Sequence, residues 1–168
     1  MFSIAKYALI FAAAPLLMMG AAGAADSSDY GGSFTESIVH REARPLDAQG
    51  RVALADVLQG KNTNTGRQDY MDGAQILATD ALALDKGNGP QNGIITFIKD
   101  GKTASSEYSG SVKTVMVDGK PQTSGEGTWK SLPGEAMIGS GTYHWAMTSE
   151  TDLSGEWEGH LEGTASAQ

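Results

Sequence analysis

Six aromatic side chains in the second half of the chain are the residues best suited to contact a small molecule. They are Phe97, Tyr108, Trp129, Tyr143, Trp145 and Trp157. Aromatic rings provide large apolar surfaces, and tyrosine and tryptophan add a polar atom that can orient a ligand. If these rings gathered on one interior surface they could line a ligand-binding pocket. The alternative is that they fill a packed core.

Acidic residues and a histidine alternate near the C-terminus and form a second candidate set. The set is Glu156, Glu158, His160 and Glu162. Side chains at alternate positions share one face of a strand, so the set could hold a cation or act as acid and base. The same alternation places it opposite Trp157 and Leu161, which favours a solvated outer face. We therefore assign no catalytic residue and no metal ligand, and we expect no cofactor.

Several other chemistries find no support in the sequence. There is no cysteine, which excludes disulfides, thiol nucleophiles and thiolate metal sites. Ser105 and Ser106 do not lie in the Gly-x-Ser-x-Gly frame of a nucleophile elbow. Gly87, Gly89 and Gly93 do not match the spacing of a dinucleotide-binding loop. Hydride and phosphoryl transfer are accordingly not expected.

The elements that must position the aromatic residues are indicated by a repeated pattern. It occurs as Gly127-Thr128-Trp129, Gly141-Thr142-Tyr143 and Gly155-Glu156-Trp157, each copy fourteen positions after the one before. Because side chains alternate along a strand, an even period keeps the three rings on the same face. The spacing therefore predicts that all three face a shared interior.

Short apolar segments separated by turn signals predict an all-β fold. We expect strands at 34–40, 51–58, 93–99, 103–109, 111–117, 122–132, 140–149 and 155–163, with a polar loop at 61–72. Asp100-Gly101 and Asp118-Gly119 predict type I′ hairpin turns. The tight sequential hairpins favour an antiparallel eight-stranded up-and-down barrel, which also removes exposed edges. A β-sandwich is the alternative.

Residues 74–85 fit two kinds of element. Alanine and leucine content, with Asp72 and Gln75 resembling a capping box, favours a helix. Against this, Ile76, Ala78, Leu82 and Leu84 share one parity and all that follows resembles strand. We favour a strand.

The chain divides into a leader and one domain. Residues 1–25 carry Lys6, an apolar run and the small residues Ala22-Gly23-Ala24, the pattern of a secretory signal peptide. We expect a flexible N-terminus at 26–33, a single barrel domain at 34–163 and a C-terminal tail at 164–168. The protein is expected to be secreted, with the periplasm favoured over the cell exterior, and without stable membrane insertion after signal removal.

Charge and composition limit the partners. The net charge is -8, with 12 lysine and arginine residues against 20 aspartate and glutamate residues and no basic cluster. Binding to nucleic acid is therefore not expected. Glycine makes up 22 of the 168 residues, about 13%, whereas its average usage is about 7%. The glycines separate apolar runs and so indicate many tight turns and bulges.

A family resemblance covers roughly residues 76 to 163. It rests on Gly87-x-Gly89-Pro90-x-x-Gly93, Tyr108-Ser109-Gly110, Gly125-x-Gly127-Thr128-Trp129, Gly139-x-Gly141-Thr142-Tyr143 and Trp157-Glu158-Gly159. This pattern resembles a group of bacterial secreted proteins similar to the allene oxide cyclase and dirigent-type barrels. The resemblance implies an eight-stranded antiparallel barrel with an apolar interior. Residues 133–136, Pro-Gly-Glu-Ala, depart from the Gly-Gly-Thr-Gly run of the group.

Three classes of function follow as expectations. The first is binding of a small apolar or amphipathic ligand inside the barrel, by the six aromatic residues. The second, by analogy with the barrel family, is a cofactor-free isomerase or cyclase that folds its substrate against the aromatic lining. The third is a structural or interaction protein that uses an outer barrel face and could form oligomers.

Overall fold

The computed structural model describes residues 27–64, 71–135 and 137–163, and these form one closed β-barrel. Eight antiparallel strands make up this described part of the chain: β1 (Ser27–Pro45), β2 (Arg51–Asn64), β3 (Gln75–Asp85), β4 (Gly89–Lys99), β5 (Lys102–Val117), β6 (Lys120–Ser131), β7 (Met137–Met147) and β8 (Asp152–Gly163). The predicted signal peptide (1–25) and C-terminal tail (164–168) lie outside the described residues. The described residues contain no helix that is both long and apolar enough to cross a membrane.

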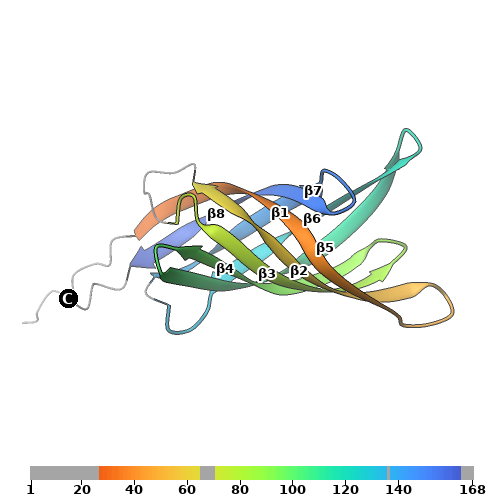
Figure 1. Ribbon diagram of the computed structural model, residues 1–168, viewed down its shortest axis with the longest axis horizontal. Helices are drawn as coiled ribbons and strands as arrows, with labels where there is room; N and C mark the ends of the chain where they lie inside the picture. The colour runs from red at the N-terminus through yellow and green to blue at the C-terminus, as the bar shows by residue number, and fades with distance from the viewer. Residues whose placement is uncertain (1–26, 65–70, 136, 164–168) are drawn as a thin grey trace, which may run out of the picture.

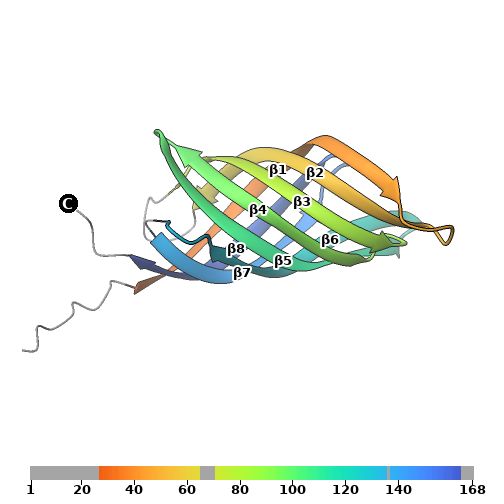
Figure 2. The same cartoon turned by 90° about the horizontal axis from the view of Figure 1, so that it is seen from below.

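Every strand pairs with its neighbours in sequence, and β1 pairs with β8 to close the barrel (Figure 1). The strands run at a slant around the barrel, as the view in Figure 2 shows. The predicted up-and-down barrel is therefore confirmed, and the sandwich alternative is wrong because a single sheet closes on itself. Closure pairs the strand edges along the wall. The β1–β2 and β5–β6 hairpins extend past it, since β1 has no β8 partner after Ser37 and β6 has no β7 partner before Ser124.

The hairpin turns follow from local chemistry. Asp100 and Gly101 have φ values of 50° and 75°, and Asp118 and Gly119 have 49° and 77°. These positive values are those that a type I′ turn requires at both central positions, so the two predicted turns are confirmed. Lys86-Gly87, with φ values of 51° and 80°, makes a further turn of this kind between β3 and β4.

Two predicted boundaries in the first half of the barrel are wrong. β1 begins at Ser27, so residues 27–33, expected to be a flexible N-terminus, pair with β8. β2 continues to Asn64, so the first part of the expected 61–72 loop is strand. In both cases polar residues belong to strands because a neighbouring strand satisfies their backbone groups, which local composition does not reveal.

A third boundary error lies in the middle of the chain. The segments expected at 103–109 and 111–117 form one strand, β5. Gly110 does not turn the chain, because it pairs with Gln91 of β4 on one side and with Gly127 of β6 on the other.

Residues 75–85 form strand β3, which confirms the strand interpretation over the helix. Burial alternates strictly along it, and the inward positions are Ile76, Ala78, Asp80, Leu82 and Leu84. Asp80 is thus the one inward residue of β3 with a charged side chain.

A β-bulge in β1 changes which side chains of that strand face inward. The pairing of β1 with β2 shifts between Ile38 and His40, so Val39 is an extra residue. Arg41 consequently lies directly opposite the inward-facing Asp56. A bulge of this kind re-aims the side chains that follow it.

Candidate functional site

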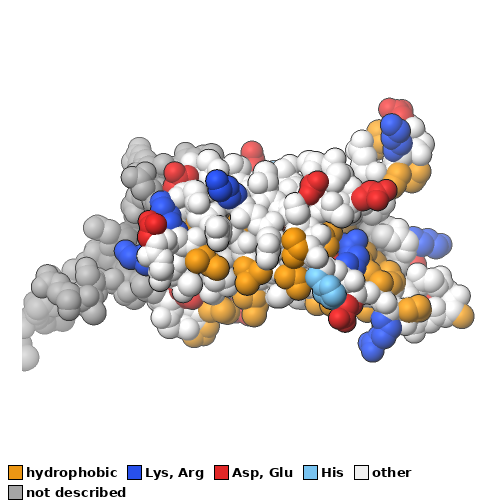
Figure 3. All heavy atoms as spheres, in the orientation of Figure 1, with side chains coloured by type: hydrophobic (Ala, Val, Ile, Leu, Met, Phe, Trp, Pro, Cys, Tyr) orange, Lys and Arg blue, Asp and Glu red, His pale blue; other side chains and the backbone are white. Residues whose placement is uncertain are grey.

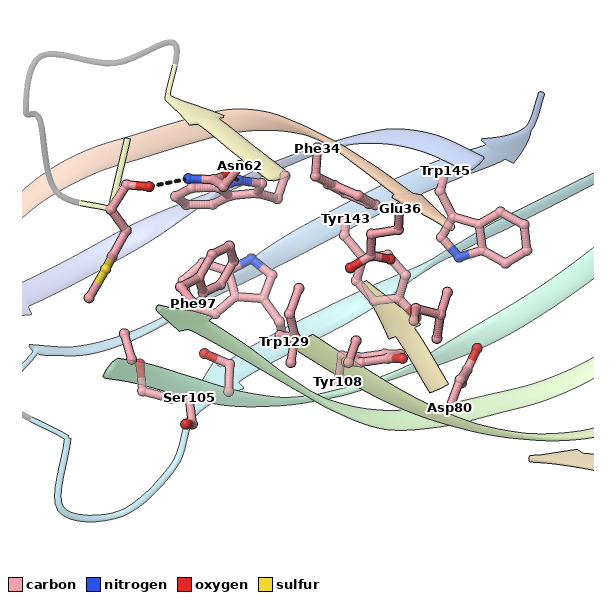
Figure 4. Close-up of a pocket in the computed structure, with 18 of the residues that line it drawn as sticks. Phe34, Glu36, Asn62, Asp80, Phe97, Ser105, Tyr108, Trp129, Tyr143 and Trp145 are labelled. Atoms are coloured by element: carbon pink, nitrogen blue, oxygen red, sulfur yellow. Dashed lines mark hydrogen bonds between the residues drawn. The ribbon is translucent and has the colours of Figure 1, made fainter. Parts of the chain in front are cut away.

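A cavity of about 100 Å³ lies inside the barrel (Figure 4). Its lining runs from Met71 and Glu135, next to the connections after β2 and β6, to Asp80 and Trp145 deeper in the barrel. All six aromatic residues singled out in the sequence line it, namely Phe97, Tyr108, Trp129, Tyr143, Trp145 and Trp157. Tyr143 and Trp145 are buried, at 8% and 7% exposure, and the other four are partly buried.

The rings contact one another across neighbouring and distant strands. Trp129 and Trp157 meet edge to face with their centroids 5.8 Å apart, and Tyr108 and Tyr143 do so at 5.5 Å. Tyr143 lies directly opposite Trp157 in the register of β7 and β8. The fourteen-residue repeat therefore does bring its three rings to a shared interior.

Glycines one or two strands away make room for these rings. A Cβ atom added at Gly159 would overlap the Trp129 ring, and one added at Gly93 would overlap the Tyr108 ring. Gly125 has the same relation to Trp145. The recurrent glycines thus let large rings lie flat along the inner wall, which leaves space at the centre of the barrel.

Asn62 is the most deeply buried side chain of the lining, at 0% exposure. Its Nδ2 donates to the carbonyl oxygen of Met71 at 2.9 Å, drawn as a dashed line in Figure 4, and its Oδ1 accepts from Trp157 Nε1 at 2.9 Å. Asn62 therefore fixes Trp157 and ties the end of β2 to the chain just before β3.

Two carboxylates enter the cavity from β1 and β3. Glu36 is 7% exposed and Asp80 is 8% exposed, and both belong to the lining. Glu36 Oε1 and Asp80 Oδ1 are buried and accept no hydrogen bond from any group of the described residues. Figure 4 shows Glu36, Tyr143, Asp80 and Trp145 toward the same end of the cavity.

Gln91 links Asp80 to the aromatic wall. Its Nε2 donates to Asp80 Oδ2 at 2.6 Å. Its Oε1 accepts from Tyr143 Oη at 3.3 Å and from Trp145 Nε1 at 3.2 Å. One amide therefore orients a carboxylate, a phenol and an indole. The Tyr108 hydroxyl, which donates to the Thr79 carbonyl at 3.2 Å, also interacts with the Asp80 carboxylate and opposes the upward shift of its pKa, while Asp80 Oδ1 has no hydrogen-bond partner of good geometry among the described residues.

A third inward carboxylate, Asp56, has a cation of its own. Arg41 Nε and Nη2 donate to its two oxygens at 2.7 and 2.6 Å. The Asp56 side chain is 3% exposed and that of Arg41 41% exposed. Since a bidentate pair satisfies both oxygens, Arg41 offsets the charge of Asp56 and leaves Glu36 and Asp80 without a comparable partner.

The pKa values of both cavity acids are shifted upward. Burial, with a smaller contribution from the charge of Asp80, raises the pKa of Glu36 from 4.5 to about 7. Burial also raises the pKa of Asp80 from 3.8 to about 7, with the charge of Asp56 adding to it and the Gln91 hydrogen bond opposing it. Burial raises the pKa of Tyr108 and of Tyr143 as well, so both phenols stay protonated.

The polar stripe near the C-terminus lies on the outside, as expected. Glu156, Glu158 and His160 are exposed. On the same outer face, His144 Nε2 lies 3.7 Å from Glu156 Oε2. In the part of the chain that the structure describes, no three histidine or acidic side chains gather as a metal-ion site.

Sequence reasoning missed the polar half of the site, which consists of Glu36, Asn62, Asp80 and Gln91. A signal existed for Asp80, since it interrupts an otherwise apolar parity in 76–84. Glu36 stands two positions after the inward Phe34, but the expected strand there alternated only loosely. Asn62 fell in an expected loop, and nothing local distinguishes Gln91.

Fold and site together define a class of protein, a small closed β-barrel with an aromatic cavity that holds two buried acids without a basic partner. Within that class, comparison with known proteins adds no closer assignment. No protein-family model matches the sequence, and no curated protein matches it.

Proposed function

We propose that this protein binds a small amphipathic molecule inside its barrel. The observation that carries the proposal is the cavity itself, which has an aromatic wall and two hydrogen-bond acceptors directed into it. A few polar groups within a mostly apolar lining are typical of ligand sites. A core that served packing alone would gain nothing from burying two acceptors without donors.

The cavity volume limits the size of the proposed ligand. Drug-sized ligands occupy pockets of about 300 to 1,000 Å³, whereas this cavity measures about 100 Å³. A water molecule takes about 30 Å³ in the liquid, so the space suits roughly three or four groups of that size. The ligand is therefore expected to have few non-hydrogen atoms.

The indole N–H signals of the three tryptophans provide a direct test, because all three line the cavity. Fragments of three to six non-hydrogen atoms are added to the 15N-labelled protein, and saturable shifts of these signals are expected. Ala104→Leu, which fills part of the cavity wall, should weaken the response, and Thr103→Leu on the exposed side of β5 should not. Shifts that are absent, or equal in both variants, would refute the proposal.

An enzymatic role is the second candidate, favoured by the pKa values of the cavity acids. A carboxylate with a pKa of about 7 is suited to act as a general base near neutral pH, and its protonated form as a general acid. Proton transfer within a bound substrate, as in an isomerase or cyclase, would need no cofactor. The test is solvent deuterium incorporation into a bound fragment, which Glu36→Gln should abolish.

An assembly role has a corresponding surface on the outer wall. Figure 3 shows hydrophobic side chains gathered over β2, β3 and β4. The exposed hydrophobic residues of β3 and β4 include Leu77 and Ile94, at 42% and 45% exposure. Analytical ultracentrifugation of the wild type and of Leu77→Lys would separate this candidate from ligand binding, because only assembly predicts a mass that the outer-face variant lowers.

A further inference from the structure

Charge within the barrel is unbalanced at the inner end of the cavity. Three acids from three consecutive strands face inward there, Glu36 on β1, Asp56 on β2 and Asp80 on β3. Arg41 forms its two hydrogen bonds with Asp56. When all four groups are ionised, the cluster carries an excess of two negative charges.

The two acids without a basic partner, Glu36 and Asp80, are also the ones with an acceptor atom that has no donor. A buried acceptor without a donor costs about 1 to 3 kcal/mol, and more when it is charged. Glu36 Oε1 and Asp80 Oδ1 are both such atoms, and both residues face the cavity. A ligand that supplies hydrogen-bond donors and positive charge would therefore satisfy the two acceptor atoms and offset the excess negative charge.

The backbone next to Glu36 is shaped to admit this side chain. Glu36 lies opposite Gly60 of β2, and a Cβ at Gly60 would lie 2.7 Å from Glu36 Cγ. Any side chain there would displace the carboxylate or the strand. The glycine thus lets the Glu36 side chain lie against the wall with its carboxyl group in the cavity.

The aromatic wall matches a positively charged ligand as well. Ring faces attract cations, most strongly those of tryptophan, and the attraction grows when water is excluded. Tyr143 and Trp145 are buried beside the acids, and Trp129 and Trp157 line the rest of the cavity. Acids combined with aromatic faces form a recognition surface for an organic ammonium group.

We infer that the cavity binds a small organic cation, a primary ammonium compound with a short carbon chain. The inference rests on the ligand-binding function proposed above and specifies its ligand class. The ammonium N–H groups donate to Glu36 Oε1 and Asp80 Oδ1, and the carbon chain packs against the aromatic rings of the lining. An ammonium group has three donors and so can satisfy both oxygens.

The test compares two probes of equal size, n-propylammonium and 1-propanol, by titration against the tryptophan indole signals of the full chain at constant ionic strength. Propylammonium should bind at least tenfold more tightly. Equal or weaker affinity than propanol would overturn the inference while leaving the proposed function intact. If neither probe gives saturable shifts, both fail. Potassium chloride that displaces propylammonium at equal concentration would also overturn it, because the organic chain would then be irrelevant.

Variants separate recognition by the acids from a general effect of charge. Glu36→Gln and Asp80→Asn should each lower the affinity for propylammonium at least tenfold and leave that for propanol within twofold. Glu42→Gln is the matched control, since that side chain is on the same strand and 78% exposed. Both cavity variants remove a buried acid that has no basic partner, and the Asp80→Asn side chain keeps an oxygen that can accept from Gln91, so they should fold. Undiminished propylammonium binding in Glu36→Gln and Asp80→Asn would contradict the inference.

The dependence on pH gives an independent readout. Titratable or charged groups facing the two acids are Asp56 with Arg41, Tyr108 and Tyr143, in addition to the acids themselves. The two tyrosines stay protonated, and both oxygens of Asp56 accept hydrogen bonds from Arg41. A cation prefers the ionised acids, so its affinity should rise between pH 6 and pH 8 while that of propanol stays constant. A flat profile for propylammonium would exclude ionisation of these acids as the basis of binding.

Discussion

Arg41 and Asp56 form a pair whose two members differ sharply in exposure. The Asp56 side chain is 3% exposed and the Arg41 side chain 41% exposed. Removing one partner of a buried pair is costly because it leaves the other charge buried and uncompensated. The cost therefore depends on which residue is removed.

We predict that Arg41→Ala destabilises the protein more than Asp56→Ala. Loss of Arg41 leaves the buried Asp56 unpaired and removes a cation that also interacts with Asp80, so we expect a loss of about 2 to 3 kcal/mol. Loss of Asp56 leaves an arginine that can reach water, so we expect about 1 kcal/mol. Urea unfolding measures both values, and the reverse order would contradict the argument.

Asn62 provides a second prediction at this scale. Asn62→Ala removes the acceptor of the Trp157 indole and the donor to the Met71 carbonyl. The Trp157 indole then loses its acceptor, while the Met71 carbonyl keeps the hydrogen bond from the Ala74 N–H, so we expect destabilisation by about 1 to 3 kcal/mol and a changed Trp157 indole N–H signal. Thr63→Ala, exposed on the same strand, is the control and should leave both unchanged.

Among the elements, the strands of the second half share one construction, in which an inward ring lies over a glycine of another strand. Trp129 over Gly159 is an example, and the Ser140 carbonyl oxygen lies 2.5 Å from where a Cβ at Gly159 would be. Because backbone and ring both confine the position, a side chain there must move the strand or expel the ring.

Gly159→Ala should therefore destabilise the barrel by about 1 to 3 kcal/mol, the usual cost of overpacking. It should also disturb the Trp129 indole N–H signal, because Trp129 Nε1 donates to the Glu158 carbonyl at 3.1 Å. Ser140→Ala, an exposed position on β7, is the control. An unchanged unfolding midpoint for Gly159→Ala would contradict the argument, because the Trp129 ring could then adopt another position without cost.

Sequence alone predicted the elements whose geometry is set locally. The Asp-Gly turns depend on two residues each, and the repeated ring faces depend on strand alternation, so both were accessible. Glu36 and Asp80 were not, because they become a site only through the closure of β1 onto β8 and β2. The bulge at Val39 added a difficulty, since it inserts one residue and so brings Arg41 opposite Asp56, where unbroken alternation would have turned Arg41 outward.

For the whole molecule, the buried acids link folding to pH. Glu36 and Asp80 have ordinary pKa values of 4.5 and 3.8 and values of about 7 in the barrel. Below about pH 4 both acids are protonated in the folded and unfolded chains, and their contribution to the free energy of unfolding is fully present. As pH rises toward 7 the unfolded chain releases these protons first, so stability falls through this window.

We predict that the folded state loses about 3 kcal/mol per acid, on the order of 6 kcal/mol for the two, between pH 4.5 and pH 8. The melting temperature should fall by roughly 20 °C. Asp47 and Asp152, whose pKa values are lowered by hydrogen bonds from Arg51 and from Ser37 respectively, act in the opposite sense. Their contribution is lost only as pH falls below about 4, so it does not mask the trend.

The variant Glu36→Gln/Asp80→Asn isolates the cause of this trend. Neither new side chain titrates, so the double variant should be more stable than the wild type at pH 8 and have a nearly flat profile between pH 4.5 and pH 8. Glu42→Gln/Glu156→Gln, with two exposed acids changed, should retain the wild-type slope. Differential scanning calorimetry in buffers of matched ionic strength measures all three proteins. A slope that persists in the first double variant would locate the proton linkage outside the barrel cavity.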